Sequence, residues 1–163
     1  YRGAMSTWVQ PLVVGGKVFV CDYGTGAMLD VGAGSVQEVW RVPEASTLLL
    51  GAWVFTGGWI YGSRSWGLLG WGTEAGEFSC IDPASGKVRW SNDFGWGTIA
   101  AAGGRLILLS RDGKLRVAAA DPTAYVELAA TELPAGLYET PPVLVGKRLY
   151  IRSAGALMCI DVR

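Results

Sequence analysis

The sequence predicts an all-β protein made of repeated units, and three observations support this fold class. Glycine turns recur at a nearly constant spacing, and short segments rich in β-branched and aromatic residues flank each turn. The helical pattern of apolar residues at i, i+3, i+4 and i+7 is nowhere sustained. The composition agrees, because 50% of the 163 residues are hydrophobic, 17% are charged and 24 are glycine, which suits many tight turns.

Four runs that begin at a turn define the repeat. They read "GGKVFVCDYGTGAMLDV" from Gly15, "GGWIYGSRSWG" from Gly57, "GGRLILLSRDGKLRVAAADP" from Gly103 and "VGKRLYIRSAGALMCIDV" from Val145. This alignment gives Gly16, Gly58, Gly104 and Gly146 the same repeat position, with steps of 42, 46 and 42 residues. Internal repetition at such a period is typical of propellers, solenoids and other arrays.

Each unit has the same internal order. An apolar segment leads to the turn, a second segment such as "KVFV" follows, a glycine-containing hairpin leads to a third segment, and a fourth such as "VQEVWRV" closes the unit. Four short strands make one antiparallel blade of a β-propeller. We therefore expect one propeller segment over residues 1–163 with about four blades, approximately 7–42, 47–92, 96–133 and 137–163. The fourth unit stops after three strands, so the last blade should lack its outer strand.

The segment "CIDPASGKVRW", residues 80–90, is the most specific part of the repeat. It resembles the blade signature of quinoprotein-like β-propellers, the PQQ-like repeat family of PQQ-dependent alcohol dehydrogenases and BamB-type outer-membrane assembly lipoproteins. "LDVGAGSVQEVW" is a looser copy with two extra residues before Trp40, and "AADPTAYVEL" lacks both the Gly and the Trp. The resemblance covers essentially the whole chain, but it says almost nothing about the function.

An acidic residue ends the third strand of every unit, as Asp30, Asp82, Asp121 and Asp161. A residue needed once for chemistry has no reason to recur, so we expect each to cap the turn between strands three and four by accepting backbone N–H bonds. Gly86 and Trp90 belong to the same structural signature, and Trp90 is expected to dock between blades.

The three cysteines favour packing over chemistry. Cys80 and Cys159 are equivalent and are expected on the inward face of strand three, where a free thiol behaves as a small hydrophobe; Cys21 lies on a second strand. An odd number of cysteines without CxxC spacing indicates neither a disulfide framework nor a thiolate metal site.

Other function classes lack their characteristic residues. The chain has no histidine, which excludes Ser-His-Asp and Cys-His nucleophile systems, HExxH zinc sites and histidine-ligated haem within this chain. It has no phosphate-binding glycine loop, and its formal net charge of zero gives no sign of nucleic-acid binding. No apolar run approaches the ~20 residues that span a bilayer. The sequence thus predicts no catalytic, cofactor-binding or metal-binding residues, and no cofactor.

Two sets of aromatic residues are candidates for contact with a ligand or protein partner. Trp8, Trp96 and Tyr138 lie in the loop that leads into strand one, on the face where the central channel opens, and packing is the alternative role for them. The insertion "GSRSWGLLGWGTEAG" in the second blade carries Trp66 and Trp71, which either contact a partner or cover a neighbouring blade or subunit.

The resemblance implies a closed ring of seven or eight blades, of which this chain supplies about half. Either the chain is the C-terminal part of a longer propeller, or two copies form a homodimer that completes an eight-bladed ring. Exposed edges and apolar blade faces favour self-association of the isolated piece.

Two functions are compatible with the resemblance. The first is a non-enzymatic binding or assembly scaffold of the cell envelope, with a periplasmic or envelope location implied by the family alone. The second is a segment of a PQQ-dependent dehydrogenase, a class that binds quinone and calcium through Glu, Asn and Asp. Asn92 is the only asparagine of this chain, so those cofactor residues would have to lie in blades outside it.

Overall fold

The computed structural model describes residues 9–22, 25–43, 52–65 and 76–162, and these residues form four antiparallel sheets. The strands of the first two sheets are β1 (Leu12–Val14), β2 (Lys17–Asp22), β3 (Thr25–Gly32), β4 (Ser35–Val42), β5 (Trp53–Thr56), β6 (Trp59–Ser65), β7 (Gly76–Ile81) and β8 (Val88–Asn92). Those of the last two are β9 (Gly97–Ala102), β10 (Arg105–Ser110), β11 (Lys114–Ala119), β12 (Glu127–Glu132), β13 (Val143–Val145), β14 (Arg148–Arg152) and β15 (Leu157–Asp161). The all-β prediction of about four blades, with three strands in the last, is confirmed.

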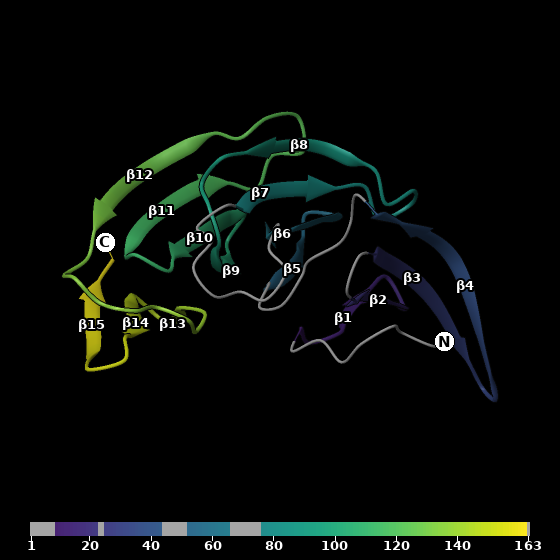
Figure 1. Cartoon of the computed structure of the whole chain (residues 1–163), viewed down its shortest axis with the longest axis horizontal. Coiled ribbons are helices and arrows are strands. Elements are labelled where there is room, and N and C mark those ends of the chain that lie inside the picture. Colours follow the sequence, from purple (N-terminus) through teal and green to yellow (C-terminus); the bar gives the residue numbers. More distant parts are fainter. Residues whose placement is uncertain (1–8, 23–24, 44–51, 66–75, 163) are drawn as a thin grey trace.

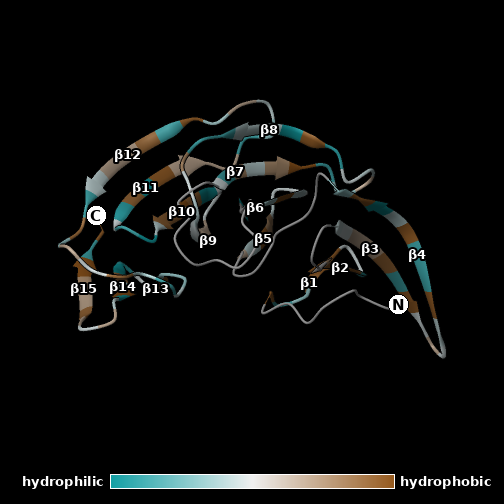
Figure 2. Ribbon diagram, viewed as in Figure 1, coloured by the Kyte–Doolittle hydropathy of each residue, from teal (hydrophilic) through white to brown (hydrophobic). Residues whose placement is uncertain are grey.

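The four sheets, which we call blades 1 to 4, follow one another along an arc (Figure 1). Strands β1, β5, β9 and β13 lie on its concave side, and β4, β8 and β12 lie outermost. Hydrophobic and hydrophilic residues alternate along β4 and β12 (Figure 2), and every residue of β12 is exposed. The outer strands are therefore the solvent-facing edge of the arc, and the apolar residues of the inner strands pack between blades.

The hairpin turns between the first and second strands show how the units are equivalent. The first residue of each turn is a glycine with positive φ: 54° at Gly15, 58° at Gly57, 55° at Gly103 and 59° at Gly146. In blades 1 to 3 a second glycine also has positive φ, as a type I′ turn requires. Lys147 holds this second place in blade 4, where Gly146 alone has positive φ, as in a type II′ turn. The sequence-based alignment is therefore one residue out of register in the fourth unit.

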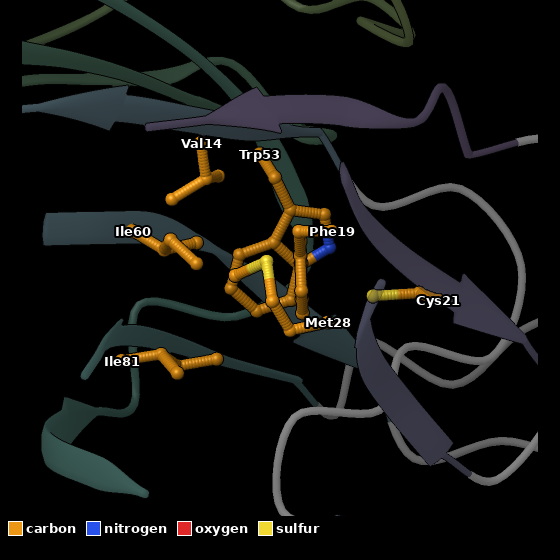
Figure 3. Close-up of a cluster of buried hydrophobic side chains, with 7 residues drawn as sticks. All are labelled: Val14, Phe19, Cys21, Met28, Trp53, Ile60 and Ile81. Carbon is orange, nitrogen blue, oxygen red and sulfur yellow. The ribbon is translucent and has the colours of Figure 1, made fainter. Parts of the chain in front are cut away.

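Three hydrophobic clusters fill the spaces between neighbouring blades. In the first, Phe19 and Met28 of blade 1 meet Trp53, Ile60 and Ile81 of blade 2 (Figure 3). The rings of Phe19 and Trp53 are edge-to-face, with centroids 5.4 Å apart. Because a fully buried large apolar side chain contributes about 1.5–3 kcal/mol, the packing between blades stabilises the arc.

Trp40 and Trp90, the outer-strand tryptophans of blades 1 and 2, each reach the next blade. The indole Nε1 of Trp40 donates a 2.9 Å hydrogen bond to the Pro83 carbonyl, and that of Trp90 donates a 2.9 Å hydrogen bond to the Asp121 carbonyl. Both acceptors belong to an Asp-Pro turn between the third and fourth strands. A tryptophan on the outer strand therefore joins two successive pairs of blades, although the acceptor is the proline of the turn in one and the aspartate in the other.

Gly86 lies against the Trp40 ring. It has a φ of 75°, and a Cβ at this position would lie 2.7 Å from Trp40 Cε3 and 2.7 Å from Val42 Cγ2. Tyr125 has the equivalent place in blade 3, four residues after the turn aspartate. Its ring meets Trp90 at an interplanar angle of 63°, with centroids 5.9 Å apart. Blade 3 therefore replaces the glycine contact with an aromatic one.

Asp82 and Asp121 both cap their turns. Asp82 Oδ1 accepts a 2.8 Å hydrogen bond from the backbone N–H of Ala84. Asp121 Oδ1 accepts hydrogen bonds from the Thr123 backbone N–H at 2.7 Å and from the Thr123 hydroxyl at 2.6 Å. These are the contacts of an Asx turn, in which the side chain orders the backbone two residues on.

The capping expectation is wrong for Asp30. Strand β3 continues to Gly32, so the hairpin turn comes after that residue, and Asp30 Oδ2 instead lies 3.8 Å from Lys17 Nζ. The two extra residues before Trp40 explain the difference, because they lengthen this hairpin. Asp161 is the last residue of β15, where it pairs with Arg148.

Cys80 and Cys159 occupy equivalent strand positions but different surroundings. Cys80 pairs with Tyr61, and Cys159 pairs with Tyr150. Cys80 is fully buried, and burial raises the pKa of its thiol to about 11. Cys159 is exposed, which corrects the expectation of an inward position, because it lies on the face of blade 4 that points away from blade 3.

Candidate functional site

A cleft of about 380 Å³ opens among the loops of blade 3. Its walls are residues 93–96 of the β8–β9 connection, residues 110–112 and 114 of the β10–β11 hairpin, and residues 136–137 ahead of β13. In an antiparallel blade the entry to strand one and the hairpin between strands two and three lie at the same end. Three loops from successive parts of the chain therefore converge at this end of the blade.

Arg111 and Trp96 form one wall of the cleft. The guanidinium carbon of Arg111 lies 5.3 Å from the centroid of the Trp96 ring, within range of a cation–π interaction. The backbone N–H of Arg111 donates to the Trp96 carbonyl at 3.2 Å, and Arg111 Nη2 lies 3.1 Å from Glu139 Oε1. Arg111 Nε is buried and has no hydrogen-bond acceptor among the described residues. The indole is therefore held in place as a flat amphipathic surface.

The β10–β11 hairpin contributes one carboxylate, Asp112, and one ammonium group, Lys114, to the cleft. The Ser110 hydroxyl donates to Asp112 and accepts the Lys114 backbone N–H at 2.8 Å, and Lys114 Nζ lies 2.9 Å from Asp112 Oδ2. The hydrogen bond from Ser110 is the main cause that lowers the pKa of Asp112, with Lys114 contributing. Asp112 is thus ionised near neutral pH and is unsuited to general-acid catalysis.

The described lining of the cleft offers binding groups rather than reacting ones. The buried Ser110 hydroxyl donates to the Asp112 carboxylate and accepts the Lys114 backbone N–H, so both of its hydrogen bonds order its own hairpin. Within the described ranges, no group of three or more Cys, Asp or Glu side chains could hold a metal ion. No helix in this part of the chain is long and apolar enough to cross a membrane.

Trp96 and Tyr138, two of the aromatic candidates, meet at the same hairpin but have different roles. Trp96 is half-buried and lines the cleft. Tyr138 is only 1% exposed, and its hydroxyl donates a 2.7 Å hydrogen bond to the Pro134 carbonyl. Burial leaves Tyr138 as a packing residue, not a contact surface. Trp8, Trp66 and Trp71 lie outside the described residues.

Arg111 is a site residue that sequence reasoning missed. Its backbone joins both loops, because it donates to Trp96 and its carbonyl accepts the Tyr138 N–H at 3.1 Å. A cation in a short "SRDGK" hairpin looks like an ordinary solvated charge. The sequence could have indicated Arg111 only through its position in the hairpin between strands two and three. This hairpin lies at the end of the blade where the loop with Trp96 enters.

Comparisons with known proteins agree on the fold. The family model described as outer membrane protein assembly factor BamB matches residues 29–163. A comparison with curated protein sequences gave no match. The BamB crystal structure from Moraxella catarrhalis is similar with a TM-score of 0.65 and 17% identity, over 92% of this chain and 41% of that one. This chain therefore spans less than half of that protein.

Two further structures are similar. The computationally designed Ika4 protein has a TM-score of 0.66 and 9% identity, over 99% of this chain and 94% of that one. A europium-containing methanol dehydrogenase has a TM-score of 0.56 and 13% identity, over 81% of this chain and 26% of that one. At such identities the similarity establishes the fold alone.

Proposed function

Because the chain belongs to the outer membrane protein assembly factor BamB family, a group of PQQ-like propellers, we propose that it is a non-enzymatic scaffold that binds a protein partner in the cell envelope. The observation that carries this proposal is the cleft whose wall is the Trp96 indole held under Arg111. Aromatic and arginine side chains in a preformed hollow are the residue types that dominate protein–protein binding.

The cleft favours an extended peptide segment of the partner. Phe94, Trp96 and Leu137 offer apolar surface, and the two cations of the lining, Arg111 and Lys114, are already paired with carboxylates of the chain. An apolar side chain of the partner would lie on the indole, while its backbone carbonyls would meet the donors of Arg111 and Lys114. Such a segment needs no new charge partner, so the desolvation cost of binding stays low.

The dehydrogenase alternative finds little support in the described residues. Calcium and quinone need a convergent set of carboxylate and amide oxygens, and the described residues contain no such carboxylate group. Asn92, the single asparagine, already accepts the Phe94 backbone N–H at 3.2 Å. The described residues therefore do not fit this cofactor, and we assign no redox chemistry to them.

A second copy of the chain is the other partner that we propose. Exposed apolar side chains occur on both end blades, including Val13 and Val31 on blade 1 and Val143 and Val145 on blade 4. Apolar patches on a soluble surface favour association.

The scaffold proposal is tested by site-specific photo-crosslinking in the cell that produces the protein. We expect a crosslinker at position 96 to form an adduct with an envelope protein, and Arg111→Ala to weaken this adduct by disordering the indole. Lys147, exposed in a turn at the opposite end of its blade, is the matched control position. Equal labelling at 96 and 147, or adducts with cytoplasmic proteins alone, would exclude the cleft as the contact site.

A further inference from the structure

The outward face of blade 4 repeats a row of side chains that blade 2 buries. Strand pairing places Val54, Tyr61 and Cys80 side by side across β5, β6 and β7. The same pairing places Val143, Tyr150 and Cys159 side by side across β13, β14 and β15. Both rows read Val, Tyr, Cys at equivalent positions once the fourth unit is aligned by its turn.

In blade 2 this row is an interface with the next blade. Tyr61 and Cys80 are 0% exposed and belong to the cluster that they share with Leu106 and Leu108 of blade 3. In blade 4 the neighbouring residues Met158 and Ile160 point back to blade 3, so the row points the other way. Val143 is accordingly 56% exposed, and Cys159 is exposed as well. The row in blade 4 has the composition of a blade interface, and no other described residues of the chain cover it.

Blade 1 presents a face that matches the covering face of blade 3. Counting from the turn, Val18 and Val20 are equivalent to Leu106 and Leu108. Val13 pairs directly with Val18, so it shares this face, which is opposite to the one that carries Phe19 and packs on blade 2. Val13 is 70% exposed. The outward face of blade 1 is therefore apolar at the positions by which one blade covers another.

We propose that a second copy of the chain covers the Val143–Tyr150–Cys159 row with the Val13–Val18–Val20 face of its blade 1. The second copy offers its own row to the first in return, so two identical contacts related by a two-fold axis close one ring. This inference rests on the proposed self-association and gives it a defined interface. It leaves the loop cleft of blade 3 free, because both contacts lie on blades 1 and 4.

Light scattering across a concentration series tests the interface. We expect the chain to have twice its mass of 17.3 kDa, and Val143→Lys and Val13→Lys each to halve the observed mass. Both positions are exposed within one chain, so neither substitution should prevent folding. Leu128→Lys, a similarly exposed apolar position on the outer strand β12, is the matched control and should remain a dimer. The proposal would be overturned if the unsubstituted chain is a monomer. It would also be overturned if Val143→Lys breaks the dimer but Val13→Lys does not.

The Cys159 thiol gives a readout that does not depend on mass. In the ring it is covered as Cys80 is, so maleimide labelling of Cys159 should be slow in the dimer and at least tenfold faster in Val143→Lys. Equally fast labelling in both would overturn the interface even if the chain is dimeric. Because these substitutions do not touch Trp96 or Arg111, a monomer that still forms the position-96 adduct would reject the ring and retain the scaffold function.

Discussion

The Trp90 indole donates its hydrogen bond to the Asp121 carbonyl, and the Asp121 carboxylate holds the turn that presents this carbonyl. One residue thus orders its own blade through the side chain and joins the preceding blade through the backbone. Trp40 and the Asp82–Pro83 turn repeat the arrangement one blade earlier. In both pairs of blades the tryptophan therefore binds a carbonyl of a turn that an aspartate caps, the Asp121 carbonyl in one and the Pro83 carbonyl in the other.

Truncation of Trp90 should destabilise the chain strongly. Trp90→Ala loses the hydrogen bond to Asp121 and the ring contacts with Tyr61, Phe78 and Tyr125, so we expect a loss of about 3 kcal/mol in the free energy of unfolding. Trp90→Phe keeps most of the ring packing and should lose only about 1 kcal/mol. Urea unfolding of both variants measures the difference, and an unchanged midpoint in Trp90→Ala would contradict the docking role.

Gly86→Ala tests the contact between Gly86 and Trp40. A non-glycine residue at positive φ costs roughly 1–2 kcal/mol, and the new Cβ would also lie 2.7 Å from the indole and force it to shift. Gly34→Ala is the control, because Gly34 has a φ of 87° with no atom within 4 Å of the added Cβ. We expect Gly86→Ala to destabilise by about 1–3 kcal/mol more than Gly34→Ala in thermal or urea unfolding. Equal losses of stability in the two variants would show that the Trp40 ring moves away from the new Cβ without a measurable loss of free energy.

The repeat could be predicted because its signals are local. Paired glycines at a turn, short β-rich segments and the Asp-to-Trp spacing at residues 82–90 each leave a pattern in the sequence. The register of the fourth unit could not be predicted, because "VG" before Lys147 resembles a "GG" turn in the sequence. Strand pairing and backbone φ separate the two. Asp30 failed for a similar reason, since hairpin length is set by strand pairing and not by the acid itself.

The candidate site was less predictable than the fold. Trp96 and Tyr138 both lie in the loop before strand one, but once the units are aligned by their turns Tyr138 lies one residue earlier than Trp96, and it is buried under the Gly113 hairpin. The sequence alignment made the two look equivalent because it placed the fourth unit one residue out of register, and exposure also depends on what the neighbouring loop contributes. Arg111 could be identified as a site residue only from the structure, in which its backbone forms hydrogen bonds with both loops.

Removal of the Tyr61 hydroxyl should not weaken the chain. Tyr61 is fully buried, and burial raises its pKa, with the neighbouring Cys80 thiol adding to the shift. Among the described residues this weakly hydrogen-bonding thiol is the neighbour of the hydroxyl, which has no hydrogen bond to an oxygen or nitrogen. An unpaired buried hydroxyl costs free energy, so Tyr61→Phe should leave stability unchanged or raise it by about 1 kcal/mol. Tyr138→Phe, which loses the hydrogen bond to Pro134, should lower stability by about 1 kcal/mol. Chemical denaturation measures the free energy of unfolding of both variants. A lower stability of Tyr61→Phe would show that the Tyr61 hydroxyl makes a stabilising hydrogen bond.

Acid should weaken the Asp121 turn in a way that depends on Thr123. The Thr123 hydroxyl is the main cause that lowers the pKa of Asp121 below its ordinary value of 3.8, and the Thr123 backbone N–H adds to it. A carboxyl with a lowered pKa in the folded state contributes stability above its unfolded pKa, and this stability is lost as the pH falls through the folded value. Thr123→Val should therefore raise the Asp121 pKa toward 3.8 and leave that of Asp112 unchanged, which an NMR titration of the side-chain carboxyl carbons measures. The stability difference between parent and variant should be constant above pH 3.8 and shrink below it; a difference independent of pH would mean that Thr123 acts through packing instead.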